Sequence, residues 1–572
     1  MKTITLESDK ETNFINDRYM WILLIISLSV RIYLSFFTYV IKNDSVAFMQ
    51  NAKFFVDGDF LSGLRHDYHP LYSFLMAVMY KVIPDMEISG TIVSVFFGTL
   101  TVIVFYLVGK SVFDRKISFV SSVILAFHPY AVRFSVDIIS ESTYFFFFIS
   151  ALGLGFFAIA KRKYSLFALT GICVALAYLA RPEGIGIILI VAGWIIFKDC
   201  VKIKTVWRGK LVSILILVIS FLVFSMPYLV YMKKDTGHWR LTKKKDLSQI
   251  VGVDAVLKSV SSKNLKKETG DGHVRKKDVL PALGTGATLE SKGGNELSTS
   301  SVRKITKQKT HSRIDLKKLK IYVNSVLYIA EKYLTTFHLF LFVFLIIGVI
   351  NWTRIKKERF FGLYIASIIA VYLFLLYRLN ITHISSYGEI YQYPSRRHLI
   401  PLVIPAIFCV GIGVYATGSW IHEKFQFSKL SYGLRGRLRD VWMVQLVIMM
   451  IIVSVLLPKT LKSQRYDKLG IKVVGQWVKE HSHKQSPAIL STSARNAYYA
   501  GGKHVQMGRI NDALGMVQAG KVDYIFMTHR EYRVIEKELL QSVKDKKIAL
   551  AYKFPEGNSL NKRSILLYKV LH

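Results

Sequence analysis

The sequence has little cysteine and little acidic charge. Only three of its 572 residues are cysteine, and all three lie in or beside apolar runs: Cys173, Cys200 and Cys409. The polar segments therefore contain no disulfide framework. Acidic residues number 38 against 77 basic ones, which gives a formal net charge of +39. The basic residues flank long apolar runs, so we expect them to contact membrane lipid headgroups and expect no nucleic-acid partner.

Several motifs of soluble enzymes are also missing. The sequence contains no glycine-rich phosphate loop, no Ser-His-Asp order and no soluble nucleotide-sugar domain. The last absence favours a lipid-linked donor for a group-transfer reaction. The polar N-terminal segment leads into an apolar run with no cleavage site after it. This run is therefore expected to be a retained span and not a signal peptide.

The sequence is instead rich in long hydrophobic runs. Hydrophobic residues make up 52% of the chain, with 37 phenylalanines and 31 tyrosines. A run of about 20 apolar residues can cross ~30 Å of hydrocarbon, and by this criterion the chain has about eleven spans. They lie near 20–41, 89–110, 117–137, 139–160, 165–181, 184–198, 211–232, 322–350, 360–378, 398–418 and 441–458.

One further apolar segment, His69–Ile83, is too short to count as a span and has the length of an interfacial helix. If it does not cross and the N-terminus is cytoplasmic, every short cytoplasmic loop is basic, as the positive-inside rule requires. These loops are Lys110–Lys116, Lys161–Lys163, Lys198–Lys210, Thr353–Arg359 and Ile421–Asp440. Counting the segment as a span would put all of them outside. We therefore predict a juxtamembrane helix on the outer face, with the first loop and the C-terminus extracytoplasmic.

The predicted fold class is mainly α: a polytopic transmembrane bundle in the cell (inner) membrane, with a small extracytoplasmic α/β domain. Residues 1–19 form the cytoplasmic N-terminus, 20–460 the transmembrane domain and 461–572 the α/β domain. The transmembrane domain includes a first outer loop at 42–88 and a lysine-rich outer loop at 233–320, whose polarity predicts flexibility. In the last domain, strand-like runs (PAILST, VDYIFMT, KIALAYKF, SILLYKV) alternate with helical ones (IKVVGQWVKEH, REYRVIEKELLQSVK).

Charged residues gather at the outer ends of the expected spans. They are Asp44 in the first loop, Glu141 between the third and fourth spans, Arg181 after the fifth, and Arg396 and Arg397 before the tenth. Such charges often act as anchors at the interface. Glu141 could also stabilise the N-terminus of its helix. Two acidic and several cationic groups on one face have a chemical use as well, in proton transfer and phosphate binding.

The residues around these charges resemble a known family. The matching pieces are NDSVAFMQNAKFF after the first span, the pair His69-Pro70, the SE of IISESTYF, the ARPEG turn and the SRRHLIPLVIPA entry to a late span. In their order along the chain and in the membrane face on which they are expected, these pieces are similar to those of bacterial polytopic glycosyltransferases of the GT-C superfamily. The resemblance is to the protein mannosyltransferase and lipid A aminoarabinose transferase group, the glycosyltransferase family 39 type, and covers residues 20–420.

The resemblance implies a membrane glycosyltransferase that moves a sugar from a polyprenyl-phosphate donor to an acceptor on the outer face, with inversion. It implies Asp44 as the catalytic base, with Glu141 as a second carboxylate. Guanidinium groups can bind phosphate bidentately, so Arg181, Arg396 and Arg397 are the candidates for binding the donor phosphate. Arg240, in the basic segment after Met232, could also contribute, although such a cluster is more often a solvated or headgroup-binding face. Protein mannosyltransferases commonly have Asp-Glu where this chain has Asp44-Ser45. The acceptor, a hydroxyl or phosphate on a lipid, glycan or protein, therefore stays open.

Two histidines in the first loop need a separate interpretation. His66 and His69 are three residues apart with Asp67 between them, a spacing that a metal site on a helical turn could use. No third or fourth ligand is near in the sequence. We therefore expect no metal site and interpret both histidines as interfacial side chains or acceptor contacts. No cofactor is indicated, although a role for a divalent cation stays open.

Two other functions compete with the enzyme. A transporter or flippase for a lipid-linked or small polar substrate would need ionisable groups or broken helices near the middle of the bilayer. The expected spans have almost no charge there, which favours the enzyme. A membrane polysaccharide polymerase or ligase would share an arginine-rich outer site but would not need the loop around Asp44.

Overall fold

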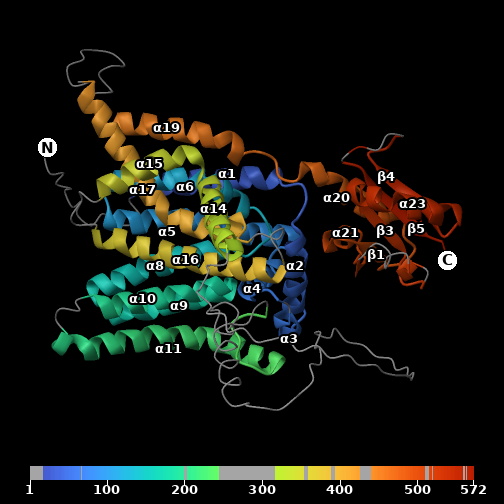
Figure 1. The fold of residues 1–572 in the computed structure, drawn as a ribbon, viewed down its shortest axis with the longest axis horizontal. Helices are drawn as coiled ribbons and strands as arrows, with labels where there is room; N and C mark the ends of the chain where they lie inside the picture. Colours follow the sequence, from blue (N-terminus) through green and yellow to red (C-terminus); the bar gives the residue numbers. More distant parts are fainter. Residues whose placement is uncertain are drawn as a thin grey trace, which may run out of the picture.

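The computed structural model describes residues 17–65, 67–198, 203–243, 316–352, 359–387, 393–425, 440–508, 515–517, 519–557, 561 and 563–571. The chain forms a helical bundle with a small α/β domain at one end (Figure 1). Most of the loop predicted to be flexible, residues 244–315, lies outside the described residues, as does His66.

The bundle is built from helices whose bounds follow the apolar runs. In chain order they are α1 (Arg18–Phe36), α2 (Asn43–Val56), α3 (Phe60–Leu64), α4 (Leu71–Tyr80), α5 (Met86–Val112), α6 (Arg115–Ala126), α7 (Pro129–Phe134), α8 (Glu141–Lys161), α9 (Tyr164–Ala180), the 3-10 helix η2 (Pro182–Ile185), α10 (Gly186–Phe197), α11 (Ile203–Thr236), α14 (Leu316–Phe337), α15 (Leu339–Trp352), α16 (Arg359–Tyr387), α17 (Arg396–Lys424) and α19 (Val441–Thr460).

Within the described part of the chain, seven helices are long and apolar enough to cross a membrane: α1, α5, α8, α11, α16, α17 and α19. Helices α9 and α10 coincide with expected spans but are shorter, and the span expected at 117–137 is divided between α6 and α7. Helices α14 and α15 would together make an eighth span but are bent by 96°. The bend lies at His338, whose φ of 76° no α-helix can contain. The span expected at 322–350 is therefore broken.

The short apolar segment at 69–83 contains only α4, a helix of 10 residues. It packs against α2 and α5. Figure 1 shows α2 running across the end of the bundle that faces the C-terminal domain. The first loop is thus a layer of short helices that covers this end of the bundle.

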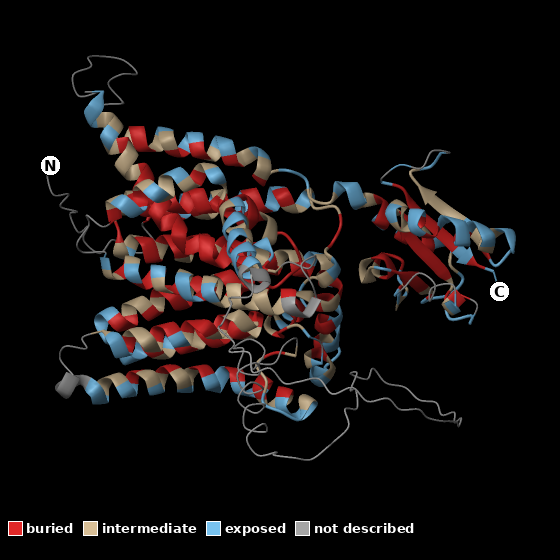
Figure 2. Ribbon diagram, in the orientation of Figure 1, coloured by how far each residue is buried: buried red, intermediate tan, exposed pale blue. Residues whose placement is uncertain are grey.

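Helix α17 is the centre of the bundle. In its most apolar stretch 89% of the residues are buried, compared with 28% in α1 and α11 (Figure 2). Two glycines let α15 approach it closely: a Cβ atom at Gly348 would lie 1.7 Å from the carbonyl oxygen of Cys409, and one at Gly413 would lie 2.0 Å from that of Phe344. This packing fixes α17, and with it the charged residues at its first turn.

The C-terminal domain has a five-stranded sheet in the order β2-β1-β3-β5-β4. Strand β1 pairs in parallel with β2 and β3, while β5 pairs antiparallel with β3 and β4. Four predicted strands and both predicted helices are confirmed, and β2 and α21 are additional. The elements are the 3-10 helix η6 (Tyr466–Lys468), α20 (Leu469–His481), β1 (Ala488–Ser491), α21 (Ala494–Tyr499), β2 (Lys503–Gln506), β3 (Tyr524–Thr528), α23 (His529–Lys544), β4 (Ile548–Phe554) and β5 (Ile565–Val570).

Candidate active site

Charged residues from four separate helix ends meet at the end of the bundle that faces the C-terminal domain. Asp44 lies in the first turn of α2, and Glu141 is the first residue of α8. Arg181 ends α9, and Arg397 lies in the first turn of α17. An apolar helix can carry a charge at low cost only near its ends, so the sequence pattern brings all four to one layer.

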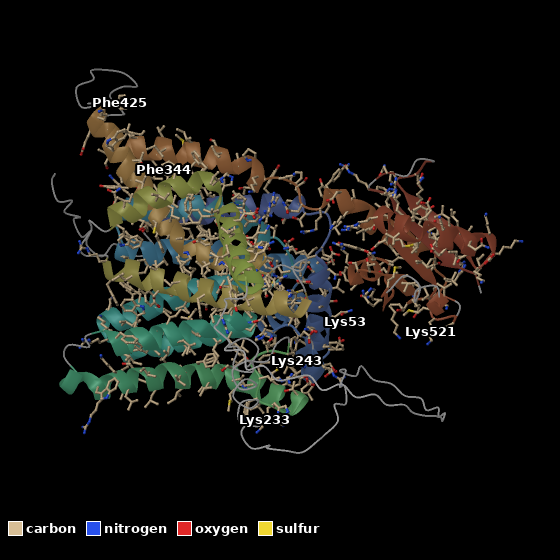
Figure 3. All side chains as sticks on the ribbon, in the orientation of Figure 1. Lys53, Lys233, Lys243, Phe344, Phe425 and Lys521 are labelled. Atoms are coloured by element: carbon tan, nitrogen blue, oxygen red, sulfur yellow. The ribbon has the colours of Figure 1, made fainter. Side chains whose placement is uncertain are left out.

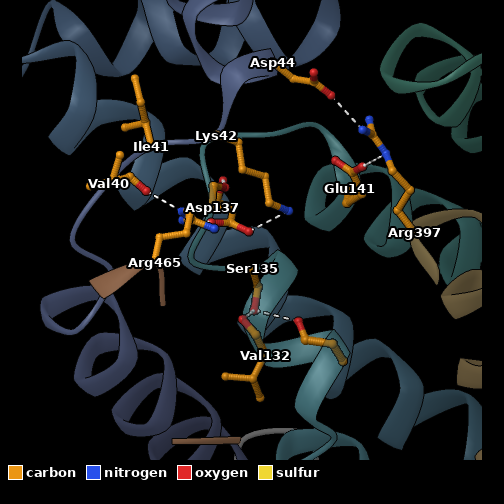
Figure 4. Close-up of polar contacts among 12 residues, drawn as sticks. Val40, Ile41, Lys42, Asp44, Val132, Ser135, Asp137, Glu141, Arg397 and Arg465 are labelled. Carbon is orange, nitrogen blue, oxygen red and sulfur yellow. Dashed lines mark hydrogen bonds and ion pairs between the residues drawn. The ribbon is translucent and has the colours of Figure 1, made fainter. Parts of the chain in front are cut away.

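These side chains form one continuous ion-pair network, and Figure 4 shows the part of it formed by Asp44, Arg397 and Glu141. The Nη1 atom of Arg397 donates to Oδ2 of Asp44 over 2.6 Å, and its Nε atom lies 2.7 Å from Oε1 of Glu141. The same Oε1 accepts from Nη1 of Arg181 over 2.7 Å. The order is therefore Asp44, Arg397, Glu141, Arg181.

A fifth residue, Glu183, extends the network at the Arg181 end. Its two carboxylate oxygens accept from Nη2 and Nε of Arg181 at 3.0 and 3.3 Å. Its backbone carbonyl accepts from the Tyr372 hydroxyl over 2.7 Å. Three carboxylates thus face two guanidinium groups within this network.

Burial falls from one end of the network to the other. The side chain of Glu141 is 0% exposed and that of Arg181 is 9% exposed. By contrast, Asp44 and Arg397 are 29% and 28% exposed. The Asp44–Arg397 pair is therefore the part of the network that a substrate can reach, while Glu141 and Arg181 support it from beneath.

The Tyr68 side chain also lies beside Asp44. Burial, together with the nearby Asp44 carboxylate, raises the pKa of the Tyr68 hydroxyl far above its usual value. The hydroxyl therefore stays protonated at neutral pH and can donate a hydrogen bond to Asp44. The sequence did not single out Tyr68, although it directly precedes His69-Pro70.

Arg396 does not join this network. Its guanidinium carbon lies 5.2 Å from the centre of the Tyr130 ring, and the Lys459 ammonium lies 5.1 Å from the same ring centre. Arg133 donates to the backbone carbonyl of Lys459 over 2.8 Å. Among the described residues, none of these three cations has a carboxylate partner within ion-pair distance. They form a cationic group that is separate from the network around Asp44.

Of the two histidines predicted as site contacts in the first loop, His69 is described by the structure. His69 is 3% exposed, and its ring packs on Tyr178 and Tyr228 at 5.0 and 5.1 Å between ring centres. It is a packed interior side chain, within a layer that also contacts the segment after α11. No group of three or more metal-ligating side chains occurs within the described residues.

The basic segment after α11, which contains Arg240, touches the first loop. Lys243 donates to the carbonyl oxygen of Arg65 over 2.8 Å and pairs with Asp235 at 2.6 Å. Figure 3 shows Lys233 and Lys243 near the end of α11, and Lys53 on α2, on the side of the bundle facing the C-terminal domain. Arg240 therefore lies at the same end of the bundle as Asp44.

A second buried ion cluster lies beneath the start of the first loop. Asp137 pairs with Lys42 at 2.7 Å and with Arg465, and its side chain is only 2% exposed (Figure 4). The sequence analysis did not predict this cluster. No local pattern connects Asp137 to Arg465, which is 328 residues away.

Several solved structures of membrane proteins have a similar architecture. ArnT from Cupriavidus metallidurans in the apo state matches with a TM-score of 0.53 at 10% identity, over 96% of this chain and 97% of that chain. The same enzyme bound to undecaprenyl phosphate gives 0.53 at 9% identity over the same shares. The Archaeoglobus fulgidus oligosaccharyltransferase, in complex with Zn and sulfate, matches with 0.51 at 12% identity, over 89% of this chain and 68% of that chain. The chain has the GT-C fold.

Sequence comparison agrees with the GT-C fold. The profile of a family described as dolichyl-phosphate-mannose-protein mannosyltransferase matches residues 67–231. This range includes Glu141, Arg181 and Glu183 but neither Asp44 nor Arg397. A search of curated proteins gave no match. The GT-C fold and the seven long apolar helices identify the chain as a multi-pass membrane protein.

Proposed function

We propose that the protein is a glycosyltransferase that transfers a sugar from a polyprenyl-phosphate donor to an acceptor hydroxyl or phosphate, with inversion. The observation that carries the proposal is the position of the Asp44–Arg397 pair. It lies in the first layer above a GT-C bundle, partly exposed, and is held by buried Glu141 and Arg181. A carboxylate and a guanidinium group side by side supply a proton acceptor and an anion-binding group.

Asp44 is the proposed general base. As the acceptor oxygen attacks the anomeric carbon from one side, its proton passes to the Asp44 carboxylate. The bond between the anomeric carbon and the phosphate oxygen breaks on the other side, and its electron pair leaves with the polyprenyl phosphate. The leaving group is already an anion, so it requires cations and no added proton.

Arg397 is proposed to change partners during donor binding. Its Nε atom faces buried Glu141, while its Nη1 atom faces exposed Asp44. A donor phosphate can therefore replace Asp44 at Nη1 while Glu141 keeps the side chain in place. This exchange supplies the phosphate with a charge-assisted hydrogen bond and frees Asp44 to accept a proton.

Arg396, Lys459 and Arg133 are proposed to attract the donor phosphate to this end of the bundle. Their charges are not balanced by described carboxylates, so an anion gains attraction here without displacing a partner. Arg240 is proposed to approach the phosphate from the segment after α11. Arg181 is proposed to act at longer range, because Glu141 and Glu183 occupy its donors.

The comparisons support a lipid-linked donor. A solved structure with the same fold is that of ArnT bound to undecaprenyl phosphate, and the matching family is described by a dolichyl-phosphate-mannose donor. We propose that the donor is a hexosyl or pentosyl polyprenyl phosphate. The site is proposed to lie on the extracytoplasmic face of the cell membrane, with the N-terminus in the cytoplasm, because the two basic loops that the structure describes in full, Lys110–Lys116 and Lys161–Lys163, lie at the other end of the bundle.

The test uses the purified full-length protein in lipid nanodiscs. A panel of polyprenyl phosphates carrying hexoses or pentoses is added with an extract of membrane lipids and glycans as acceptor, and release of polyprenyl phosphate is measured by mass spectrometry. The wild type should turn over at least one donor. Asp44→Asn should lose activity by about 100-fold or more, since it removes the base and keeps the side-chain shape.

The matched control is Asp57→Asn, because Asp57 is the exposed residue that ends the same helix. It should keep wild-type turnover. Wild-type turnover in Asp44→Asn would remove the base assignment. A wild type that turns over no donor in the panel would count against the glycosyltransferase itself.

A further inference from the structure

The backbone that leads into Asp44 is bound by the C-terminal domain. Residues 37–42 connect α1 to α2, and Asp44 is the second residue of α2. The Tyr39 N–H donates to the carbonyl of Gln464 over 3.2 Å, and the Gln464 N–H donates to the carbonyl of Phe37 over 2.8 Å. The connection thus pairs like a short strand with the segment that enters the C-terminal domain.

Arg465 continues this contact with its side chain. It donates to the carbonyl oxygen of Val40 and to Oδ1 of Asp137 (Figure 4). The other oxygen of Asp137 pairs with Lys42 at 2.7 Å. One arginine of the C-terminal segment therefore fixes the connection both directly and through the Lys42–Asp137 pair.

Helix α21 binds the last residues before Asp44. The Ile41 N–H donates to the Tyr499 hydroxyl over 3.0 Å, and Arg495 donates to the Ile41 carbonyl over 3.3 Å. The Ser493 hydroxyl donates to the side-chain carbonyl of Asn43 over 2.9 Å. Both backbone polar groups of Ile41 are thus satisfied by side chains of the C-terminal domain.

Apolar packing joins the same two regions. Buried residues of the first layer, including Ile41, Val46 and Phe48, belong to one hydrophobic cluster with Ile471 of α20 and Tyr499 of α21. The domain therefore shares a core with the layer that carries Asp44. The domain also has a second cluster of its own, around Ile525 and Leu566, but a domain that was only tethered to the bundle would not share the first one.

From these contacts we propose that the C-terminal domain positions the base. Tyr499 and Arg465 are positioning residues: they hold the backbone at residues 40–42 so that Asp44 reaches both Arg397 and the acceptor. The proposal rests on the proposed function of Asp44. A base acts only within hydrogen-bond reach of its proton, so a shift of about 1 Å in this backbone is enough to lower the rate by about 100-fold.

The first test removes one hydroxyl. Tyr499→Phe keeps the ring in the shared core and deletes only the acceptor for the Ile41 N–H. The expected result is a fall of about tenfold in kcat, with a change of less than about twofold in donor KM, because Asp44 moves while the phosphate-binding arginines do not. Arg465→Gln should act in the same direction, and Arg465→Lys should recover part of kcat.

The matched control is Tyr532→Phe in the same domain. The Tyr532 hydroxyl contacts Glu536 at 3.2 Å, within α23 and outside the shared core. It should keep wild-type kcat and KM. Unchanged kcat in both Tyr499→Phe and Arg465→Gln would overturn the positioning role, as would a change in KM alone.

A crosslink separates positioning from general stability. Asn43→Cys and Ser493→Cys are combined with Tyr499→Phe in a protein whose three native cysteines are replaced by alanine. The disulfide should form in membranes, and kcat should be several-fold higher in the oxidised than in the reduced protein. No disulfide, or equal kcat in both states, would contradict the proposal. A wild type without transferase activity would instead count against the proposed function alone.

Discussion

At the scale of single residues, the network depends on how each charge is paired. Asp44 and Arg397, for which an exchange of partners is proposed, are both partly exposed, whereas Glu141 is fully buried and joins two arginines through one oxygen. Its second oxygen, Oε2, is buried and has no hydrogen-bond partner among the described atoms. A buried acceptor without a partner costs free energy, which the two arginines at the other oxygen offset.

Glu141→Gln should therefore affect stability as well as activity. It leaves the nearly buried Arg181 with Glu183 alone and removes the anchor of Arg397, and breaking a buried pair in this way costs about 3 kcal/mol or more. The measurement is the midpoint of thermal unfolding in nanodiscs. Glu331→Gln is the control, because Glu331 is 67% exposed and pairs only loosely with Lys332. Equal midpoints for the two variants would show that the charge of Glu141 does not stabilise the fold.

Two adjacent arginines, Arg396 and Arg397, have different partners, which the sequence analysis did not predict. Arg396 and Arg397 were expected to act together, but successive residues of a helix point about 100° apart. Arg397 consequently faces Asp44, while Arg396 faces Tyr130. Asp44, Glu141, Arg181 and Arg397 could be predicted as a group because each ends an apolar run on the same side. The pairing of Asp137 with Arg465 could not, because it depends on how two distant segments pack.

At the scale of elements, α17 determines where the site lies. Its first turn carries Arg397, and its middle is fixed by close contact with α15 at Gly348 and Gly413. Hydropathy predicted that α17 spans the membrane but gave no sign of this contact. It also gave no sign of the 96° bend between α14 and α15, because apolar composition continues through a break in the helix.

Gly413→Val should lower both stability and activity. The added side chain would meet the Phe344 backbone, which cannot move away as a flexible side chain could, so overpacking should cost about 1–3 kcal/mol or more. Gly193→Val is the control, since no atom lies within 4 Å of a Cβ placed there. The yield of monodisperse protein and the thermal midpoint provide the measurement. A Gly413→Val protein as stable as the Gly193→Val protein would contradict the close contact.

At the scale of the whole molecule, the bundle has two different ends. One end bears the charged network and the C-terminal domain. At the other, Asp17 pairs with Lys110 at 2.7 Å and with Arg115 at 2.5 Å. The α/β domain was predictable from its alternating strand and helix patterns. Its attachment to the first loop was not, because β-rich sequence patterns carry no information about the surface on which a domain docks.

The orientation can be tested by labelling cysteines in intact cells. Asp57→Cys lies at the end with the network, and Lys163→Cys lies at the opposite end, with both positions exposed. A membrane-impermeant maleimide should label Asp57→Cys in intact cells and label Lys163→Cys only after the membrane is opened. The reverse pattern would place the network in the cytoplasm and remove access to a donor on the outer leaflet.

The contact between Ile41 and Tyr499 joins residues 458 positions apart in the chain. At the usual speed of ribosomes, about 20 to 90 s pass between the synthesis of these two residues. The helices can enter the membrane in order during that time, before Tyr499 has been made and can contact the segment that leads into Asp44. On the proposed role of the C-terminal domain, a ribosome that stops before Tyr499 leaves an inserted bundle whose proposed base is not yet held in position.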